Sequence, residues 1–203
     1  MDSTSTKQTS ERNPPLLVRL LGGLGCLVLS MVLAGCPPTP PKETVRVVRL
    51  PNCDLPNFQR GRAFIVEAWA VPDARFNVGE PFSLQARVSA PAYLNMFHVS
   101  TSCKVTRLLH NVHLQPTEIA DFPRQNSRAI IVKPPAGEEA IYFVATREQM
   151  AFVAEADILQ GGDGIASLDL SPAQFYQRLE QVLGRVNPDD LSVTTLRTSI
   201  VGN

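Results

Sequence analysis

Histidine and cysteine are the residue types here whose spacing could support chemistry, and the chain of 203 residues has three histidines and four cysteines. His110 and His113, in "HNVH", are three residues apart, a spacing that on a helix would place two metal-binding imidazoles on one face. The stretch is typical of a strand end and loop, and no Glu-x-x-His pattern accompanies it. We therefore expect ordinary loop histidines without a metal, and His98 as a packing residue within a strand.

The sequence patterns that support catalysis are missing from this chain. No serine occupies a Gly-x-Ser-x-Gly elbow. The glycine-rich stretch "QGGDGIASLD", residues 160–169, lacks the Gly-Lys-Ser/Thr of a phosphate-binding loop and the alternating oxygen ligands of a calcium site, so we expect a flexible loop. We predict no catalytic residue, no cofactor and no enzyme. A buried acidic pair or a histidine–carboxylate contact in a cleft would reopen the question.

Cys53 and Cys103 are the two cysteines that follow residue 36, beyond the stretch that is expected to be an export signal. In an oxidising compartment an even pair of this kind favours a disulfide. Closing a loop of about 50 residues would stabilise the fold by roughly 3–4 kcal/mol. Buried free thiols are the alternative. A metal site is not expected, because no second ligand lies at zinc-like spacing near either cysteine.

An apolar stretch ends at Cys36. Its uninterrupted part, Leu20–Ala34, is shorter than the ~20 residues of a membrane-spanning helix. It matches the apolar core of an export signal, with basic residues in front of it. The last four residues, Leu33-Ala34-Gly35-Cys36, resemble the lipobox of bacterial lipoproteins. The resemblance implies that Cys36 carries a diacylglyceryl group and that several acyl chains anchor the protein stably. The alternative is a short single-pass anchor with an incidental cysteine.

Proline follows the lipidation cysteine. Lipoproteins kept at the inner membrane carry aspartate at this position, so Pro37 favours the outer membrane, on the periplasmic side. The stretch "PPTPPKE", residues 37–43, favours extended polyproline II and is expected to be a tether, or simply a disordered start. The predicted organisation is therefore a signal peptide over 1–35, a proline-rich tether and lead-in over 36–60, and a folded domain over 61–203.

The charge balance excludes one class of partner. Nineteen basic and nineteen acidic residues give the chain no net charge, whereas a nucleic-acid-binding domain would need a basic excess. The residues beyond the signal are numerous enough for one domain with a hydrophobic core.

Alternating patterns predict a mainly β fold. In "PFSLQARVS", residues 81–89, Phe82, Leu84, Ala86 and Val88 share one face, as expected for a half-buried strand. Further extended stretches are "GRAFIVEAW", "AYLNMFHVS", "KVTRLLH", "SRAIIVK", "EEAIYFVATR" and the C-terminal "LSVTTLRTSIV". Short strands separated by turns favour an antiparallel, Ig-like β-sandwich with one or two short helices near the C-terminus.

The best predicted helix is "SPAQFYQRLEQVLGRV", residues 171–186. Ser171 is a suitable N-cap, Pro172 suits the first turn and Gln174 completes a capping box. An apolar stripe follows at helical spacing, which we expect to pack on the sheet rather than fill a partner's groove; it comprises Phe175, Leu179, Val182, Leu183 and Val186. A shorter helical turn is expected within Met150–Leu159.

The stretch "YLNMFHVSTSCKVTRLLHN", Tyr93–Asn111, resembles the core of a bacterial domain family of unknown function, which reads Tyr-Leu-x-x-Phe-x-Val, a turn, then Gly-x-Val-x-x-Leu-Phe-Pro-Asn. The resemblance extends over Phe76–Thr146. Cys103 stands where the family has glycine or a polar turn residue, and Leu109-His110 replaces Phe-Pro. The resemblance implies a small β-sandwich that binds or positions something and supplies no catalytic residue.

Together these observations predict a lipid-anchored periplasmic lipoprotein that acts as a non-catalytic binding or assembly module. Its partner would be a protein of the envelope or of a secretion system, contacted through sheet edges or the Leu108–Asp121 loop. The alternative is a module that senses or captures a small envelope ligand, a glycan or a lipid, in an apolar pocket. Candidate lining residues for that pocket are Trp69, Tyr93 and Tyr142, although core packing is the role that we expect first for each of them.

Overall fold

The structure is a computed structural model that describes residues 53–125, 127–162 and 165–202. The predicted signal peptide, Cys36 and the proline-rich tether lie outside the described residues. The described part is mainly β, with antiparallel sheets and one α-helix near the C-terminus, as the sequence predicts. The Ig-like class of sandwich stays a prediction.

Eight strands form a large sheet, in the order β1 (Arg60–Gly61), β13 (Leu191–Val201), β10 (Gly137–Thr146), β6 (Ala92–Val99), β7 (Val105–Leu114), β12 (Ile165–Leu168) and β11 (Ile158–Gly162), with β3 (Arg75–Asn77) parallel to β13. A small sheet has the order β2 (Val66–Ala70), β5 (Leu84–Val88) and β8 (Ile119–Phe122). A short pair joins β4 (Pro81–Phe82) to β9 (Ile130–Ile131). The helices are α1 (Pro172–Leu183) and the 3-10 turns η1 (Glu155–Asp157) and η2 (Pro188–Asp190).

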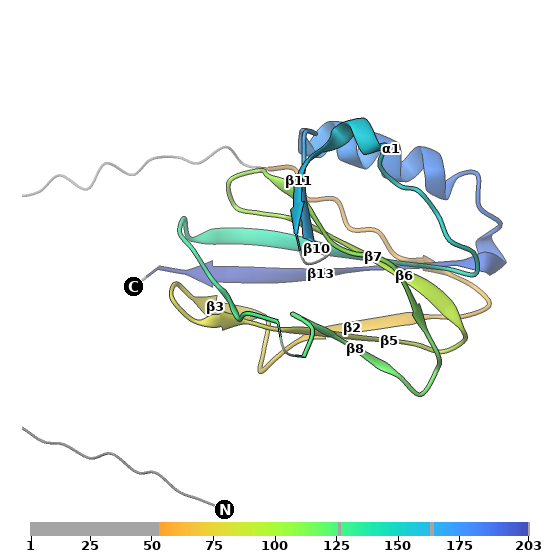
Figure 1. Cartoon of the computed structure of the whole chain (residues 1–203), viewed down its shortest axis with the longest axis horizontal. Helices are drawn as coiled ribbons and strands as arrows, with labels where there is room; N and C mark the ends of the chain where they lie inside the picture. Colours follow the sequence, from red (N-terminus) through yellow and green to blue (C-terminus); the bar gives the residue numbers. More distant parts are fainter. Residues whose placement is uncertain (1–52, 126, 163–164, 203) are drawn as a thin grey trace, which may run out of the picture. The chain divides into compact units, whose positions relative to one another are not determined.

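The large sheet is covered on both faces. The small sheet packs on one face, and α1 with the lead-in residues Leu55 and Phe58 packs on the other (Figure 1). Strand β10 shows the consequence, because its residues from Glu139 to Thr146 are all buried. Ile141 and Phe143 face the small sheet, whereas Tyr142 faces α1. A strand buried on both faces reads as a continuous apolar run, and therefore "AIYFVA" does not alternate.

The alternation predicted for residues 82–88 is confirmed. Phe82, Leu84, Ala86 and Val88 are all buried in the cluster between the sheets. The predicted C-terminal strand and the helix are also confirmed, and Ser171 caps α1: its Oγ accepts from the backbone N–H of Gln174, while the Gln174 side chain accepts from the N–H of Ser171. Phe175, Leu179 and Leu183 of the predicted stripe are buried in the cluster that α1 makes with the large sheet.

Of two local predictions, one is confirmed and one is wrong. The helical turn expected within Met150–Leu159 is the 3-10 turn η1, after which Ile158 already belongs to strand β11. Before this turn, the Asn111 amide binds both the N–H and the carbonyl of Met150. The described parts of residues 160–169 form the hairpin of β11 and β12 rather than a loop.

Strand β7 is longer than the predicted strand and contains two bulges. The register between β6 and β7 shifts on each side of Met96, so β7 holds extra residues there. One consequence is that Leu108 and Leu109, adjacent in sequence, both belong to the cluster between the sheets. The other is Asn111, whose φ of 48° is in the left-handed region that asparagine tolerates. His110 and His113 therefore lie in a strand, not in a loop.

Candidate functional site

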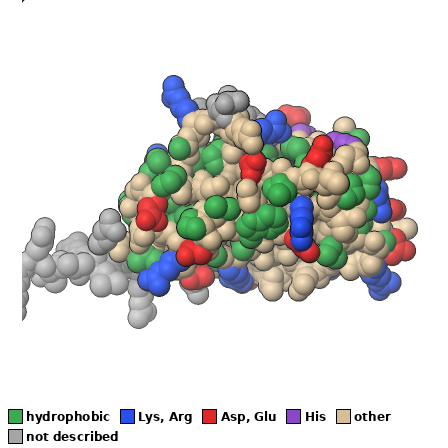
Figure 2. Space-filling model, turned by 90° about the horizontal axis from the view of Figure 1, so that it is seen from below, with side chains coloured by type: hydrophobic (Ala, Val, Ile, Leu, Met, Phe, Trp, Pro, Cys, Tyr) green, Lys and Arg blue, Asp and Glu red, His purple; other side chains and the backbone are tan. Residues whose placement is uncertain are grey.

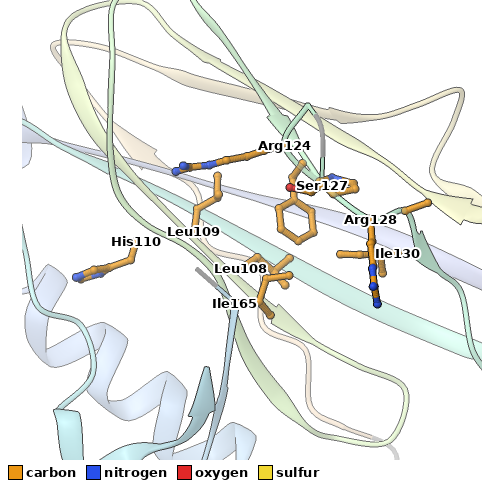
Figure 3. A pocket seen from close by; sticks show the side chains of 11 residues that line it. Leu108, Leu109, His110, Arg124, Ser127, Arg128, Ile130 and Ile165 are labelled. Atoms are coloured by element: carbon orange, nitrogen blue, oxygen red, sulfur yellow. The ribbon is translucent and has the colours of Figure 1, made fainter. Parts of the chain in front are cut away.

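Two neighbouring cavities lie beside β7. The first, of about 310 Å³, lies between β7 and the segment from β8 to β9 (Figure 3). The second, of about 370 Å³, continues along the β6–β7 turn and the segment after β9. Leu108, Phe122 and Ile130 line both cavities. We call the two cavities together the β7–β9 groove; each lies within the size range of small-molecule sites.

The floor of the β7–β9 groove is apolar because it is the edge of the core between the sheets. Leu108 and Phe122 are buried, and Ile130 packs against the same cluster. The bulge in β7 turns Leu109 toward the first cavity beside Leu108. Phe82 and Val132 extend the apolar lining in the second cavity.

A buried contact between His98 and Glu139 forms one wall of the second cavity. His98 Nε2 lies 2.9 Å from Glu139 Oε2, and Glu139 Oε1 accepts a hydrogen bond of 3.1 Å from the backbone N–H of Thr101. Glu139 is only 8% exposed. Both carboxylate oxygens thus have partners, as a buried charge requires. The Thr101 hydroxyl in turn donates to the Pro135 carbonyl, which joins the β6–β7 turn to the segment before β10.

Sequence reasoning missed the partner of His98, although a signal was present. Glu139 precedes Ile141 by two residues and therefore shares its inward face, where a carboxylate needs a partner. The pairing of Ile141 with His98 then brings the imidazole next to it. His98 is a packing residue in a strand, as predicted, and it also contacts the Phe82 ring.

His110 lines the first cavity as a neutral side chain at pH 7. Partial burial lowers its pKa, the nearby Arg107 guanidinium lowers it further, and Glu155 opposes the shift. A histidine whose pKa falls below its usual value near 6.5 carries little charge at neutral pH. Within the described residues, no three histidine, cysteine or acidic side chains lie close enough together to hold a metal ion.

The three aromatic residues suggested as pocket lining lie elsewhere. Tyr142 is fully buried under α1, where its hydroxyl donates to the Pro56 carbonyl at 3.1 Å and lies 3.2 Å from the Tyr176 hydroxyl. Tyr93 contacts the His113 ring. Trp69 lies on the outer face of the small sheet, where its Nε1 donates to Gln85. The prediction of a pocket lined by these residues is wrong for the two cavities of the groove.

Cys53 and Cys103 form the predicted disulfide, with Cα atoms 5.5 Å apart. Cys103 has a φ of 59° and closes the turn between β6 and β7, where its N–H donates to the Ser100 carbonyl. This is a left-handed turn position that glycine normally occupies, in agreement with the departure seen in sequence. The disulfide attaches the first described residues to the large sheet beside the groove.

These features define a mainly β, disulfide-linked domain with a groove at the edge of its core. Residues 75–149 match the model of a family described as "Domain of unknown function (DUF4384)", so the chain carries a DUF4384 domain at those positions. The predicted family resemblance over Phe76–Thr146 is thereby confirmed. No curated protein and no solved structure matches the chain. Of the residues that line the groove, Ile165 alone lies outside the DUF4384 domain.

The membrane attachment predicted from Cys36 concerns residues outside the described part. Among the residues that the structure describes, no helix has the length and apolarity needed to cross a bilayer.

Proposed function

We propose that this chain is a lipid-anchored periplasmic lipoprotein, held at the outer membrane through Cys36, whose folded domain is a non-catalytic binding or assembly module. The sequence supports the anchor through the Leu33-Ala34-Gly35-Cys36 motif and the proline-rich tether that follows it. The observation that carries the binding role is the terminal strand β8 of the small sheet, which carries an exposed isoleucine.

Strand β8 forms one edge of the small sheet and β2 forms the other. Ile119 of β8 is 53% exposed, and Ile65, just before β2 at the opposite edge, is 50% exposed. Figure 2 shows hydrophobic side chains interspersed with charged ones on the side of the molecule where β2, β5 and β8 lie. A terminal strand with exposed apolar side chains suits contact with an extended segment of a protein partner.

The Leu108–Asp121 segment, proposed from the sequence as a contact loop, is not a loop. It consists of the second half of β7, a turn and most of β8. The contact that we propose is therefore a strand edge. The outer face beside this edge is ordered by side-chain hydrogen bonds, because Gln85 accepts from Trp69 Nε1 at 2.9 Å and donates to Asp121 at 2.8 Å.

Cross-linking in intact cells tests the protein partner. A photo-reactive residue at Ile119 should yield a discrete adduct with an envelope protein, whereas the same residue at Glu180, which is exposed on α1, should not. Equal adducts at both positions, or none at Ile119, would contradict the proposal.

The anchor has its own test. Cys36→Ser should abolish labelling with a palmitate analogue and remove the protein from the membrane fraction, because the sulfur that carries the lipid is gone. Serine at Cys53 together with serine at Cys103 is the matched control and should leave labelling unchanged. Persistent membrane association of Cys36→Ser would favour the alternative of a short spanning anchor.

Capture of a small envelope ligand is the second candidate function, and the β7–β9 groove favours it. Cavities of about 310 and 370 Å³ with a shared apolar floor are suited to a ligand rather than to a protein strand. The His98–Glu139 contact is the feature that would favour an enzyme. We assign it a structural role, because Glu139 also binds the Thr101 N–H and thereby fixes the β6–β7 turn against β10.

A further inference from the structure

The charges around the β7–β9 groove are unbalanced. Arg124 and Arg128 line the first cavity, and Lys133 lines the second. Among the described residues that line either cavity, Glu139 is the one carboxylate, and its two oxygens lie within hydrogen-bond distance of His98 Nε2 and of the Thr101 N–H. The groove therefore has an excess of positive charge, although the net charge of the whole chain is zero. Complementary charge at such a site attracts an anion.

The two arginines of the first cavity lie next to a continuous row of apolar side chains. Arg124 and Arg128 both come from the segment that follows β8, and Figure 3 shows their side chains on either side of the first cavity. Beneath them lie Leu108, Leu109 and the Ile130 side chain. Since Leu108 and Ile130 also line the second cavity, the apolar path continues from one cavity to the other.

A ligand that matches this arrangement has an elongated apolar part and an acidic end. Burial of apolar surface contributes about 25 cal/mol per Å², which favours an acyl chain over a polar glycan on such a floor. The guanidinium groups hydrogen-bond carboxylate and phosphate oxygens in the paired geometry that arginine favours. A neutral sugar would use neither feature.

We propose that the β7–β9 groove binds a single-chain amphiphilic anion, with its acyl chain on the Leu108–Phe122–Ile130 floor and its carboxylate or phosphate at Arg124 or at Arg128, on one side of the first cavity or the other. This inference rests on ligand capture, the second candidate function, and specifies its ligand. The same chemistry is found in a free fatty acid and in a lysophospholipid.

Titration of the full chain carrying Cys36→Ser with dodecanoate, and separately with lauroyl lysophosphatidylglycerol, tests the inference. Both probes are used below their micelle concentrations, with monolaurin as the neutral probe. We expect saturable 1:1 binding of at least one anion and at least about tenfold weaker binding of monolaurin. A tenfold change in Kd is about 1.4 kcal/mol, less than hydrogen bonds to charged groups usually contribute. Whether dodecanoate or the lysophospholipid binds shows which of the two compound classes supplies the ligand.

Variants locate the site. Arg124→Gln with Arg128→Gln should weaken anion binding at least about tenfold, whereas the matched double change Arg62→Gln with Arg185→Gln, at exposed positions that line neither cavity, should not. Ser127→Trp, at an exposed position on the first cavity, should block binding of the acyl chain while the thermal unfolding temperature stays near that of the parent chain.

Three results would overturn the inference: no saturable binding of either anion, equal binding of monolaurin, or equal losses in the two double variants. None of them bears on the Ile119 cross-link or on lipid labelling at Cys36, which are measured separately. Failure of the amphiphile ligand is thus distinguishable from failure of the anchored binding module.

Discussion

Asn111 joins three parts of the chain through one side chain. Its Oδ1 accepts from the Met150 N–H at 3.2 Å and from Asn95 Nδ2 at 2.9 Å, and its Nδ2 donates to the Met150 carbonyl at 3.2 Å. Its backbone N–H donates to Asn95 Oδ1 at 3.0 Å. Asn95 is fully buried, so it depends on Asn111 for these partners. Asn111 therefore fixes the β7 bulge and the path of the chain after β10.

We expect Asn111→Ala to lower the free energy of unfolding by about 3 kcal/mol. The change removes the acceptor of the buried Asn95 Nδ2 and both bonds to Met150, although the backbone N–H of residue 111 can still donate to Asn95 Oδ1, and it places alanine in a left-handed conformation. Gln177→Ala, which removes an exposed amide from α1, is the control and should cost less than about 0.5 kcal/mol. Urea unfolding followed by circular dichroism measures both. A loss below about 1 kcal/mol for Asn111→Ala would show that the contacts are dispensable.

The buried tyrosine pair makes stability depend on alkaline pH. Burial, together with the hydrogen bond to Tyr176, raises the pKa of Tyr142 far above its ordinary value near 10. Burial also raises the pKa of Tyr176. Because the folded state favours the neutral phenols, this contribution to stability is complete below about pH 10 and is lost as pH rises further, where the unfolded chain ionises.

The unfolding temperature of the parent chain should therefore fall steeply above about pH 10, and Tyr142→Phe should show a flatter decline because one of the two phenols is gone. At neutral pH the variant should be less stable by about 1 kcal/mol, since its hydrogen bond to Pro56 is lost. Tyr93→Phe, which leaves the buried pair intact, should keep the parent profile. Parallel profiles for the parent and Tyr142→Phe would contradict the assignment.

A residue-level contact is predictable from the sequence where residue type alone singles out the partners. Cys53 and Cys103 could be paired from a count, because they are the two cysteines that follow the predicted export signal and the predicted lipidation site Cys36. The His98–Glu139 contact needed the register of β6 against β10, which pattern alone does not supply. The groove also depends on the bulges in β7, and nothing in "TRLLHNVH" marks where a strand gains an extra residue.

At the scale of elements, α1 has the clearest origin in the sequence. Ser171 and Gln174 form a reciprocal capping box, and Pro172 occupies the first turn. The buried stripe then fixes which side of the helix meets the sheet. A helix with a start signal and an apolar stripe is predictable in detail, whereas for η1 the sequence indicated only a helical turn somewhere within Met150–Leu159.

Ser171→Ala should destabilise the fold by about 1 kcal/mol, because it removes the acceptor for the Gln174 N–H at the start of α1. Gln174→Glu keeps the box and adds a negative charge near the helix N-terminus, so it should be neutral or slightly stabilising. Chemical unfolding of the two variants beside the parent gives both values. Equal destabilisation of the two would argue against the cap.

Some strands are also predictable from the sequence and others are not. Strand β5 alternates because one of its faces meets the core and the other does not, and the sequence shows it. Strand β10 is buried on both faces, which removes the alternation, and β9 is only two residues long, too short to show a period. The three-layer arrangement, with α1 on the second face of the large sheet, could therefore not be predicted from the alternation of apolar residues. The apolar stripe of α1 indicated only that the helix packs on a sheet.

At the scale of the whole molecule, the disulfide connects the lead-in to the sheet. It closes a loop of 50 residues, and Leu55 and Phe58 pack under α1 immediately after it. The Thr195 hydroxyl accepts from the Phe58 N–H and donates to its carbonyl, so the same segment is also held by strand β13. A mechanical force applied to the proposed tether would therefore be transmitted to the folded domain first through this disulfide.

Replacing both cysteines by alanine should lower the free energy of unfolding by roughly 3–4 kcal/mol in the loop-entropy account. Cys53→Ala combined with Cys103→Gly should lose about 1 kcal/mol less, because glycine adopts the positive φ of position 103 without strain. Denaturant unfolding of both double variants gives the difference. If the glycine variant is no more stable than the alanine variant, the positive φ at position 103 does not affect the free energy of unfolding.

Strand β13 pairs with β10 along the whole of β10, and it also pairs with β1 and β3. Strand β13 lies outside residues 75–149. Within the DUF4384 segment, therefore, β10 has β6 as a neighbour on one side and no strand on the other. During synthesis, β10 leaves the ribosome well before the strand that completes it. The large sheet can therefore close on this side only after β13 has been made, and we expect this pairing of distant segments to form late in folding.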